Sequence, residues 1–170
     1  MRFLRTLTFL AAAIATAGAA AAHEFHAGDL SLEHPWIAEP PPGAPTAAGF
    51  LVITNDGNAA DRLIDVRCEF ADRSEIHEMK VDDAGVMQMR QLADGLEIPA
   101  GQSVTLAKGG YHLMFMHVTE RPVVGDMVPV TLVFEHAGEV DLMFSVQAHG
   151  DDAMDDHMEM DGSMDMESSQ

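Results

Sequence analysis

Methionine and histidine recur at alternate positions in three short segments of this sequence. The segments are His77-Glu78-Met79, Met87-Gln88-Met89 and His112-Leu113-Met114, and Met116 follows two residues later. Side chains two residues apart on a β-strand project from the same face, about 6.5–7 Å from each other. If these segments are strands, each one directs two metal donors towards a single site.

The chemistry of these donors favours reduced copper. Thioether sulfur is a soft, uncharged ligand that suits Cu(I), whereas imidazole accepts several transition metals. Zinc prefers thiolate, imidazole or carboxylate, and calcium requires oxygen ligands. We therefore predict a Cu(I) site made of two methionines and two histidines, or of three methionines and one histidine.

Methionine also fills gaps in apolar cores, which is the alternative explanation for these residues. One Met-x-Met pair alone would favour core filling. Three donor pairs at strand spacing, two of them with histidine, favour a metal site instead. We expect Met127 and Met143 to pack in the structure rather than to bind metal, and we expect His34, His117 and His136 to be surface or hydrogen-bonded residues.

Short apolar or alternating segments, separated by turn residues, indicate the elements that carry the donors. The expected strands are 30–37, 48–54, 63–66, 75–81, 86–92, 102–107, 111–118, 128–134 and 140–148. Strands of this length, repeated about every ten residues with no convincing helical window, predict an all-β sandwich or barrel.

Turn residues set how these strands connect. Asn55-Asp56-Gly57-Asn58 is a hairpin-type signal, and Asp82–Gly85 predicts a hairpin that brings His77 opposite the face of Met87 and Met89. The proline-rich segment 40–45 predicts a loop, because proline cannot pair in a central strand.

The two ends of the sequence differ from the body. Arg2 and Arg5 precede an apolar stretch that ends in alanines at Ala22, which predicts a signal peptide, 1–22, cleaved within about two residues of that point. The stretch is shorter than the roughly 20 residues that span a bilayer comfortably. We expect export to the periplasm, no stable membrane insertion, one domain over 23–149, and a disordered acidic tail over 150–170.

Acidic residues dominate the composition, with 28 against 9 basic residues and a formal net charge of −19. Such a surface repels nucleic acid and attracts cations and basic partners, so nucleic-acid binding is excluded. Cys68 is the only cysteine, and we expect it to be a buried strand residue. The sequence has no nucleophile elbow, phosphate loop or C-x-x-C motif, so we expect a carrier and not an enzyme.

Several motifs together resemble one known family. They are Leu32-Glu33-His34-Pro35-Trp36, the run from Pro42 to Phe50, Glu75-Ile76-His77-Glu78-Met79, Gly85-Val86-Met87-Gln88-Met89-Arg90, Ile98-Pro99-Ala100-Gly101 and Gly109-Gly110-Tyr111-His112-Leu113-Met114. This chain resembles the periplasmic PCu(A)C copper chaperones over about residues 30 to 146. The resemblance implies a cupredoxin-like antiparallel β-sandwich that binds Cu(I) near its surface.

The resemblance also implies a ligand set and a role. The family's ligands correspond to His77, Met89, His112 and Met114, with Met87 as a rival for Met89 and Met79 as a further alternate. Family members supply copper for cytochrome c oxidase assembly, so a copper-accepting protein of the cell envelope is the expected partner of a monomeric carrier.

The tail resembles the Met/His-rich extensions of some family members. It implies a second, looser copper site, in which histidine and carboxylates collect Cu(II) while the methionines suit Cu(I). The candidate ligands there are His149, Met154, His157, Met158 and Met160.

Two other functions remain open from the sequence. Copper sequestration or resistance would depend mostly on the tail. An electron-transfer cupredoxin would need a His₂Cys site with a weak axial methionine, and Cys68 lacks the clustered downstream histidine and methionine of that class.

Overall fold

The computed structural model describes residues 24–82 and 84–148, which fold into eleven β-strands. They are β1 (Glu24–Ala27), β2 (Leu30–Ala38), β3 (Thr46–Asn55), β4 (Asp61–Cys68), β5 (Ala71–Val81), β6 (Met87–Gln91), β7 (Leu96–Ile98), β8 (Ser103–Leu106), β9 (Tyr111–Val118), β10 (Met127–Phe134) and β11 (Gly138–Gln147). None of the described residues belongs to a helix long and apolar enough to cross a bilayer. The predicted all-β fold is confirmed.

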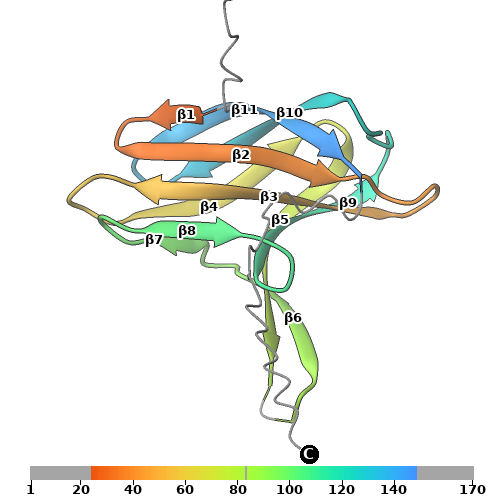
Figure 1. Ribbon diagram of the computed structural model, residues 1–170, viewed down its shortest axis with the longest axis horizontal. Helices are drawn as coiled ribbons and strands as arrows, with labels where there is room; N and C mark the ends of the chain where they lie inside the picture. The colour runs from red at the N-terminus through yellow and green to blue at the C-terminus, as the bar shows by residue number, and fades with distance from the viewer. Residues whose placement is uncertain (1–23, 83, 149–170) are drawn as a thin grey trace, which may run out of the picture.

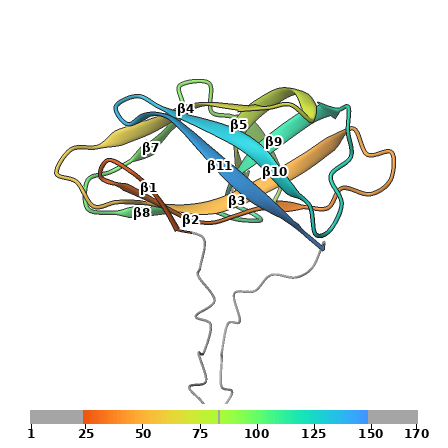
Figure 2. The same ribbon diagram turned by 90° about the horizontal axis from the view of Figure 1, so that it is seen from above.

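The strands form one hydrogen-bonded path that folds over into two layers. The order is β6-β5-β9-β8-β3-β2-β11-β10-β4-β7, and β1 pairs with β2. The path turns at the β2–β11 pair, so β2, β3 and β8 face β4, β10 and β11 (Figure 1 and Figure 2). Most pairs are antiparallel, as predicted, whereas β2–β11 and β8–β9 are parallel.

The hairpin predicted at Asn55–Asn58 is wrong. β3 pairs with β2, β8 and β9, but β4 pairs with β10 and β7, so the chain crosses between layers after β3. The Asn55 side chain explains the signal, because its Oδ1 accepts a hydrogen bond from the N–H of Gly57 and forms a local turn. A turn does form at these residues, but it leads from one layer into the other and does not close a hairpin.

Buried side chains from both layers make one apolar core, and this core orients β9. Leu113 and Phe115 of β9 are fully buried in it. Because side chains alternate along a strand, His112 and Met114 project from the opposite face of β9. Gly49 on β3 leaves room for this packing, since a Cβ there would lie 2.8 Å from Cε2 of Phe115.

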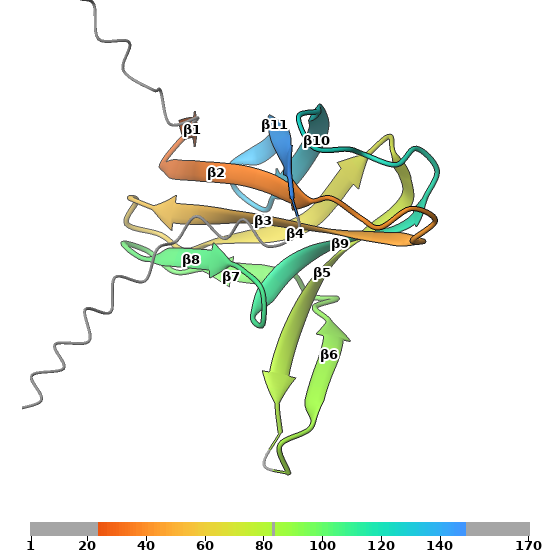
Figure 3. The ribbon, with the colours of Figure 1, turned by 45° about the vertical axis from the view of Figure 1, so that its right-hand side comes forward.

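The far end of β5 leaves the two layers and, with β6, forms a projecting hairpin (Figure 1 and Figure 3). Asp82 organises its turn, because its Oδ1 accepts hydrogen bonds from the N–H groups of Ala84 and Val86. Gly85 adopts a φ of +79°, which suits glycine. The turn predicted at Asp82–Gly85 and the β5–β6 pairing are both confirmed.

Candidate metal centre

Strand register places the predicted donors on one face of three neighbouring strands. On β5 and β9, His77 pairs with His112 and Glu75 pairs with Met114. On β5 and β6, Met79 pairs with Met89. Cross-strand partners project from the same face. We call this surface of β5, β6 and β9 the donor face, and it carries Glu75, His77, Met79, Met87, Met89, His112 and Met114.

His77 lies at the centre of the donor face. His112 is directly opposite it, and the two rings have their centroids 5.7 Å apart at an interplanar angle of 60°. Met114 and Met89 occupy diagonal positions on the two flanking strands, and diagonal neighbours lie about 7–8 Å apart, within reach of long side chains. Each of the other three predicted ligands is therefore a direct or a diagonal cross-strand neighbour of His77.

The ring of His77 has one bonded nitrogen and one unbonded nitrogen. Nε2 lies 2.7 Å from Oε2 of Glu75. Nδ1 is buried and is the only buried side-chain nitrogen or oxygen among the described residues that lacks a hydrogen-bond partner. Buried polar atoms are almost always satisfied in folded proteins. The unpartnered Nδ1 of His77 is therefore the feature that a bound metal would explain.

His112 is also arranged to present one nitrogen. Its Nδ1 lies 3.1 Å from the carbonyl oxygen of Gly110, so Nδ1–H donates that bond and Nε2 keeps its lone pair. Burial lowers the pKa of His112; the bond to Gly110 acts in the opposite direction, and the nearby His77 lowers the pKa further. The neutral imidazole, which is the form that binds metal, is thereby favoured.

The donor face is graded from buried to exposed. The two histidines are only 8% and 4% exposed, Met79 and Met114 are half-buried, and Met89 on the projecting hairpin is 48% exposed. The imidazoles therefore lie beneath the surface, and the thioether of Met89 meets solvent. No group of three or more His, Cys, Asp and Glu side chains is positioned to hold a metal in residues 24–82 and 84–148.

Register distinguishes Met89 from Met87. Met87 pairs with Val81, which is four residues from His77 along β5, or roughly 13 Å at strand spacing. Met87 is also 68% exposed. Met89 pairs with Met79, only two residues from His77. The geometry therefore favours Met89 over its rival.

The reverse face of the hairpin carries charges instead of soft donors. The Glu78 carboxylate is 2.7 Å from Nζ of Lys80 and 2.7 Å from Nη2 of Arg90. Hydrogen bonds from these two cations lower the pKa of Glu78. Arg90 pairs across the strands with Glu78, so this ion pair joins β5 and β6 on the face opposite the donors.

Two residues beside the donors, Glu75 and Arg73, were not predicted as part of the site. Glu75 is 9% exposed, and its Oε1 lies 3.0 Å from Nε of Arg73. Nη2 of Arg73 also lies 3.0 Å from the sulfur of Met116. The signal for Glu75 and Arg73 was present, since they precede His77 by two and four residues and therefore share its face.

The predictions for the remaining methionines and histidines have mixed outcomes. Met127 and Met143 are exposed, at 44% and 40%, so the prediction that they pack is wrong. They lie on the outer face of β10 and β11, where Leu142 and Phe144 take the core positions beside Met143. His34 and His117 are exposed and His136 contacts Asp61, as expected. The tail candidates His149, Met154, His157, Met158 and Met160 lie outside the described residues.

Cys68 lies on the other side of β5 from the donors. Its sulfur is 3.6 Å from Oγ of Ser74, which alternates with Glu75 and so faces away from the donor face. Cys68 is in β4 as predicted, although it is half-buried. Burial raises the pKa of its thiol, which disfavours the thiolate that metals bind.

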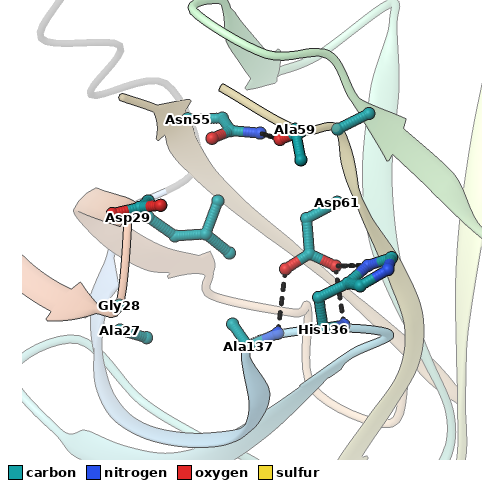
Figure 4. Close-up of a pocket in the computed structure, with 10 residues that line it drawn as sticks. Ala27, Gly28, Asp29, Asn55, Ala59, Asp61, His136 and Ala137 are labelled. Atoms are coloured by element: carbon teal, nitrogen blue, oxygen red, sulfur yellow. Dashed lines mark hydrogen bonds and ion pairs between the residues drawn. The ribbon is translucent and has the colours of Figure 1, made fainter. Parts of the chain in front are cut away.

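A second polar cluster lines a pocket of about 250 Å³ where β3 ends and β4 begins (Figure 4). Asp61 accepts hydrogen bonds there from the backbone N–H groups of Arg62, His136 and Ala137, at 2.7, 3.0 and 2.9 Å. Asn55 Nδ2 donates to the carbonyl oxygens of Ala59 and Ile98. Backbone groups satisfy both side chains, so we interpret this cluster as structural.

Comparison with known proteins places this geometry in a family. The LpqE-like family model matches residues 30–146. The protein Lxx21020 of Leifsonia xyli subsp. xyli (strain CTCB07), which is named as a lipoprotein, is 30% identical over 92 residues, covering 54% of this chain and 55% of that protein. The chain thus spans about half the length of this curated relative.

Solved structures extend the comparison to the whole sandwich. A copper-bound PCuAC domain from PmoF2 is 31% identical with a TM-score of 0.64, covering 75% of this chain and 99% of that domain. An apo PCuAC domain from PmoF1 gives the same identity and TM-score, covering 75% and 100%. Apo-DR1885 from Deinococcus radiodurans, at 22% identity and a TM-score of 0.56, covers 86% and 97% and is alike in fold. The chain belongs to the LpqE-like family, and its body is a PCuAC-type domain with the predicted cupredoxin-like sandwich.

Proposed function

We propose that this protein is a copper carrier that binds Cu(I) through His77, His112, Met114 and Met89. One observation carries the proposal, namely the central position of His77 on the donor face with a buried Nδ1 that lacks a partner. The relationship to a PCuAC domain that is copper-bound supports it. Met79 is the nearest alternate ligand, because it lies two residues from His77 on the same strand.

The donor types suit the reduced ion. Two thioethers and two neutral imidazoles bring no charge of their own and are soft enough to favour Cu(I). The copper here is cargo, and the protein has no need to change it chemically. We therefore propose a carrier and not an enzyme.

The grading of the donor face suits release of the cargo. Met89 lies on the projecting hairpin and meets solvent, whereas His77 and His112 are buried. A partner can replace the outer thioether first and the imidazoles later, so ligand exchange proceeds in steps. The net charge of −19 favours a partner with a basic docking surface.

The setting we propose is the periplasm. Residues 1–22 would be a cleaved signal peptide, residues 23–149 the copper-binding domain, and the expected recipient a copper-accepting protein of the cell envelope such as the copper centre of cytochrome c oxidase. The lipoprotein name of the relative agrees with a protein of the cell envelope. We expect the carrier to be a monomer.

Growth phenotypes test delivery against its main alternative. Deleting the gene of a delivery protein lowers oxidase activity when copper is scarce, and added copper restores it. Deleting a sequestration protein leaves oxidase intact and makes cells sensitive to high copper. We expect the first phenotype, and the second one alone would contradict delivery.

The tail is the sequence feature that favours sequestration as a second candidate, because it contains Met154, Met158, Met160, Met164 and Met166. We propose a weaker second copper site there. A variant truncated after residue 149 should lose one equivalent of bound copper and keep tight Cu(I) binding. Unchanged stoichiometry would refute the second site.

Colour distinguishes the carrier from an electron-transfer cupredoxin. A His₂Cys site gives an intense blue Cu(II) form. We expect a colourless Cu(I) protein, and an intense blue band on oxidation would overturn the ligand set, since it would require Cys68.

A further inference from the structure

We propose that Glu75 is a positioning residue, which fixes the tautomer of His77 so that Nδ1 is offered to copper. The proposal deepens the function argued above and rests on it. Glu75 is not a soft donor and was not among the predicted ligands. Its contacts, and not its own affinity for copper, assign this role.

The contact between the two side chains determines which nitrogen carries the proton. Oε2 of Glu75 lies 2.7 Å from Nε2 of His77, and both side chains are buried. An ionised carboxylate can only accept hydrogen bonds, so Nε2–H must be the donor. A neutral imidazole that carries its proton on Nε2 has its lone pair on Nδ1.

The opposite tautomer would be penalised twice. Nδ1 is buried without a partner, so a proton there would be an unsatisfied buried N–H. The lone pair of Nε2 would also face the carboxylate oxygen at hydrogen-bond distance. The fold therefore selects one tautomer before any metal binds.

Arg73 holds the carboxylate in place from the other side. Its Nε lies 3.0 Å from Oε1 of Glu75, so each carboxylate oxygen of Glu75 has one partner. Both oxygens are already bonded to basic side chains, and we assign Glu75 a role that acts through His77. Arg73 also contacts the Met116 sulfur with Nη2, which gives the guanidinium a second point of attachment.

A carboxylate bonded to a ligating imidazole does two things for the metal. It sets the ring orientation, and it makes the imidazole a stronger electron donor. Loss of such an outer partner typically costs about 10–100-fold in metal affinity. For this protein we expect loss of the Glu75 contact to lower Cu(I) affinity by a factor in the same range.

The test combines Glu75→Gln with a matched control, Glu78→Gln. Both glutamates are almost fully buried in β5 and both bind basic side chains, but Glu78 lies on the reverse face with Lys80 and Arg90. A glutamine at position 75 can accept from, or donate to, Nε2, so it no longer dictates the tautomer. Glu75→Leu serves as a second variant that removes the hydrogen bond altogether.

Two measurements are made on the full chain, and the first needs no copper. Nitrogen-15 NMR of the apo protein should show His77 as the Nε2–H tautomer in the wild type and in Glu78→Gln, and as a mixture of tautomers in both position-75 variants. Competition with a Cu(I) chelator should show that Cu(I) affinity falls roughly 10–100-fold in the position-75 variants and less than about twofold in the control.

The outcomes separate this proposal from the function on which it rests. An Nδ1–H tautomer in the apo wild type, or an unchanged tautomer in Glu75→Leu, overturns the role of Glu75 even if the protein binds copper tightly. Equal affinity losses in Glu75→Gln and Glu78→Gln would also overturn it. Absence of tight Cu(I) binding by the wild type, with the tautomer as expected, would instead refute the carrier.

Discussion

Two regions of this protein hold a buried carboxylate against a histidine, and they differ in what is left unpaired. Asp61 contacts His136 and accepts backbone hydrogen bonds from Arg62, His136 and Ala137 (Figure 4). Glu75 contacts His77, which retains an unpartnered buried nitrogen on the donor face. The hydrogen bonds of Asp61 are made within the fold, whereas the contact of Glu75 with His77 leaves the other ring nitrogen of that histidine without a partner. The unpaired nitrogen, and not the acid–histidine pair, therefore marks the candidate site.

Removing two donors from the donor face should have the largest effect. We expect His112→Ala combined with Met114→Ala to weaken Cu(I) binding by at least about 1,000-fold, which corresponds to ~4 kcal/mol. The reason is that half of the proposed ligand set is lost. Competition with a Cu(I) chelator measures the effect.

A matched control for this variant removes one imidazole and one thioether elsewhere. His136→Ala combined with Met143→Ala changes two exposed residues outside the donor face. Its Cu(I) affinity should equal that of the wild type. Near wild-type affinity in the His112/Met114 variant would show that the site lies elsewhere.

Substitution of Asp61 should lower the stability of the fold and leave copper binding unchanged. Asp61→Ala leaves the N–H groups of Arg62, His136 and Ala137 without their acceptor, so we expect the free energy of unfolding to fall by about 3 kcal/mol. Denaturant unfolding of the apo protein measures this. A marked loss of Cu(I) affinity in the folded variant would remove the distinction between the two regions.

Acid should abolish the contribution of Asp61. Burial acts to raise the pKa of Asp61, but hydrogen bonds from the backbone N–H groups of His136, Arg62 and Ala137 lower it, and the net pKa lies below its usual value near 3.8. A lowered pKa stabilises the fold above the unfolded-state pKa, and this stabilisation is lost as pH falls through the folded-state pKa. The stability difference between wild type and Asp61→Ala should therefore be constant above about pH 5 and shrink below about pH 4. A difference that grows on acidification would contradict this assignment.

The smallest effect separates the two methionines of β6. Met89→Ala should weaken Cu(I) binding by about tenfold, or ~1.4 kcal/mol, whereas Met87→Ala should change it less than about twofold. Met89 is a diagonal neighbour of His77, and Met87 lies further along the hairpin. The reverse order of effects would mean that the hairpin shifts its register when copper binds.

Much of the site could be predicted because its strands are constrained on both faces. Tyr111, Leu113 and Phe115 alternate with His112 and Met114, so core and donor patterns together predicted the bounds of β9 to the residue. The β5–β6 hairpin was predictable from its turn residues. The choice between Met87 and Met89 was not, because a shift of two residues keeps the same face towards the site.

Other features depend on information that local patterns lack. β1 and β7 have four and three residues, too few to display an alternation. The crossing after Asn55 follows from strand pairing distant in sequence, whereas its turn chemistry is local. Glu75 is not a soft donor, so the methionine and histidine pattern did not include it, although the same alternation rule places it beside His77.

X-ray absorption on the Cu(I)-loaded protein tests the central claim most directly, because it identifies the atoms bound to the metal. A mixture of thioether sulfur and imidazole nitrogen scatterers, with no oxygen ligand, is the predicted result. Compared with the wild type, the His112/Met114 variant should show fewer sulfur and fewer nitrogen scatterers around copper. A copper ion surrounded only by nitrogen and oxygen, or a spectrum that the variant leaves unchanged, would contradict a site on the donor face.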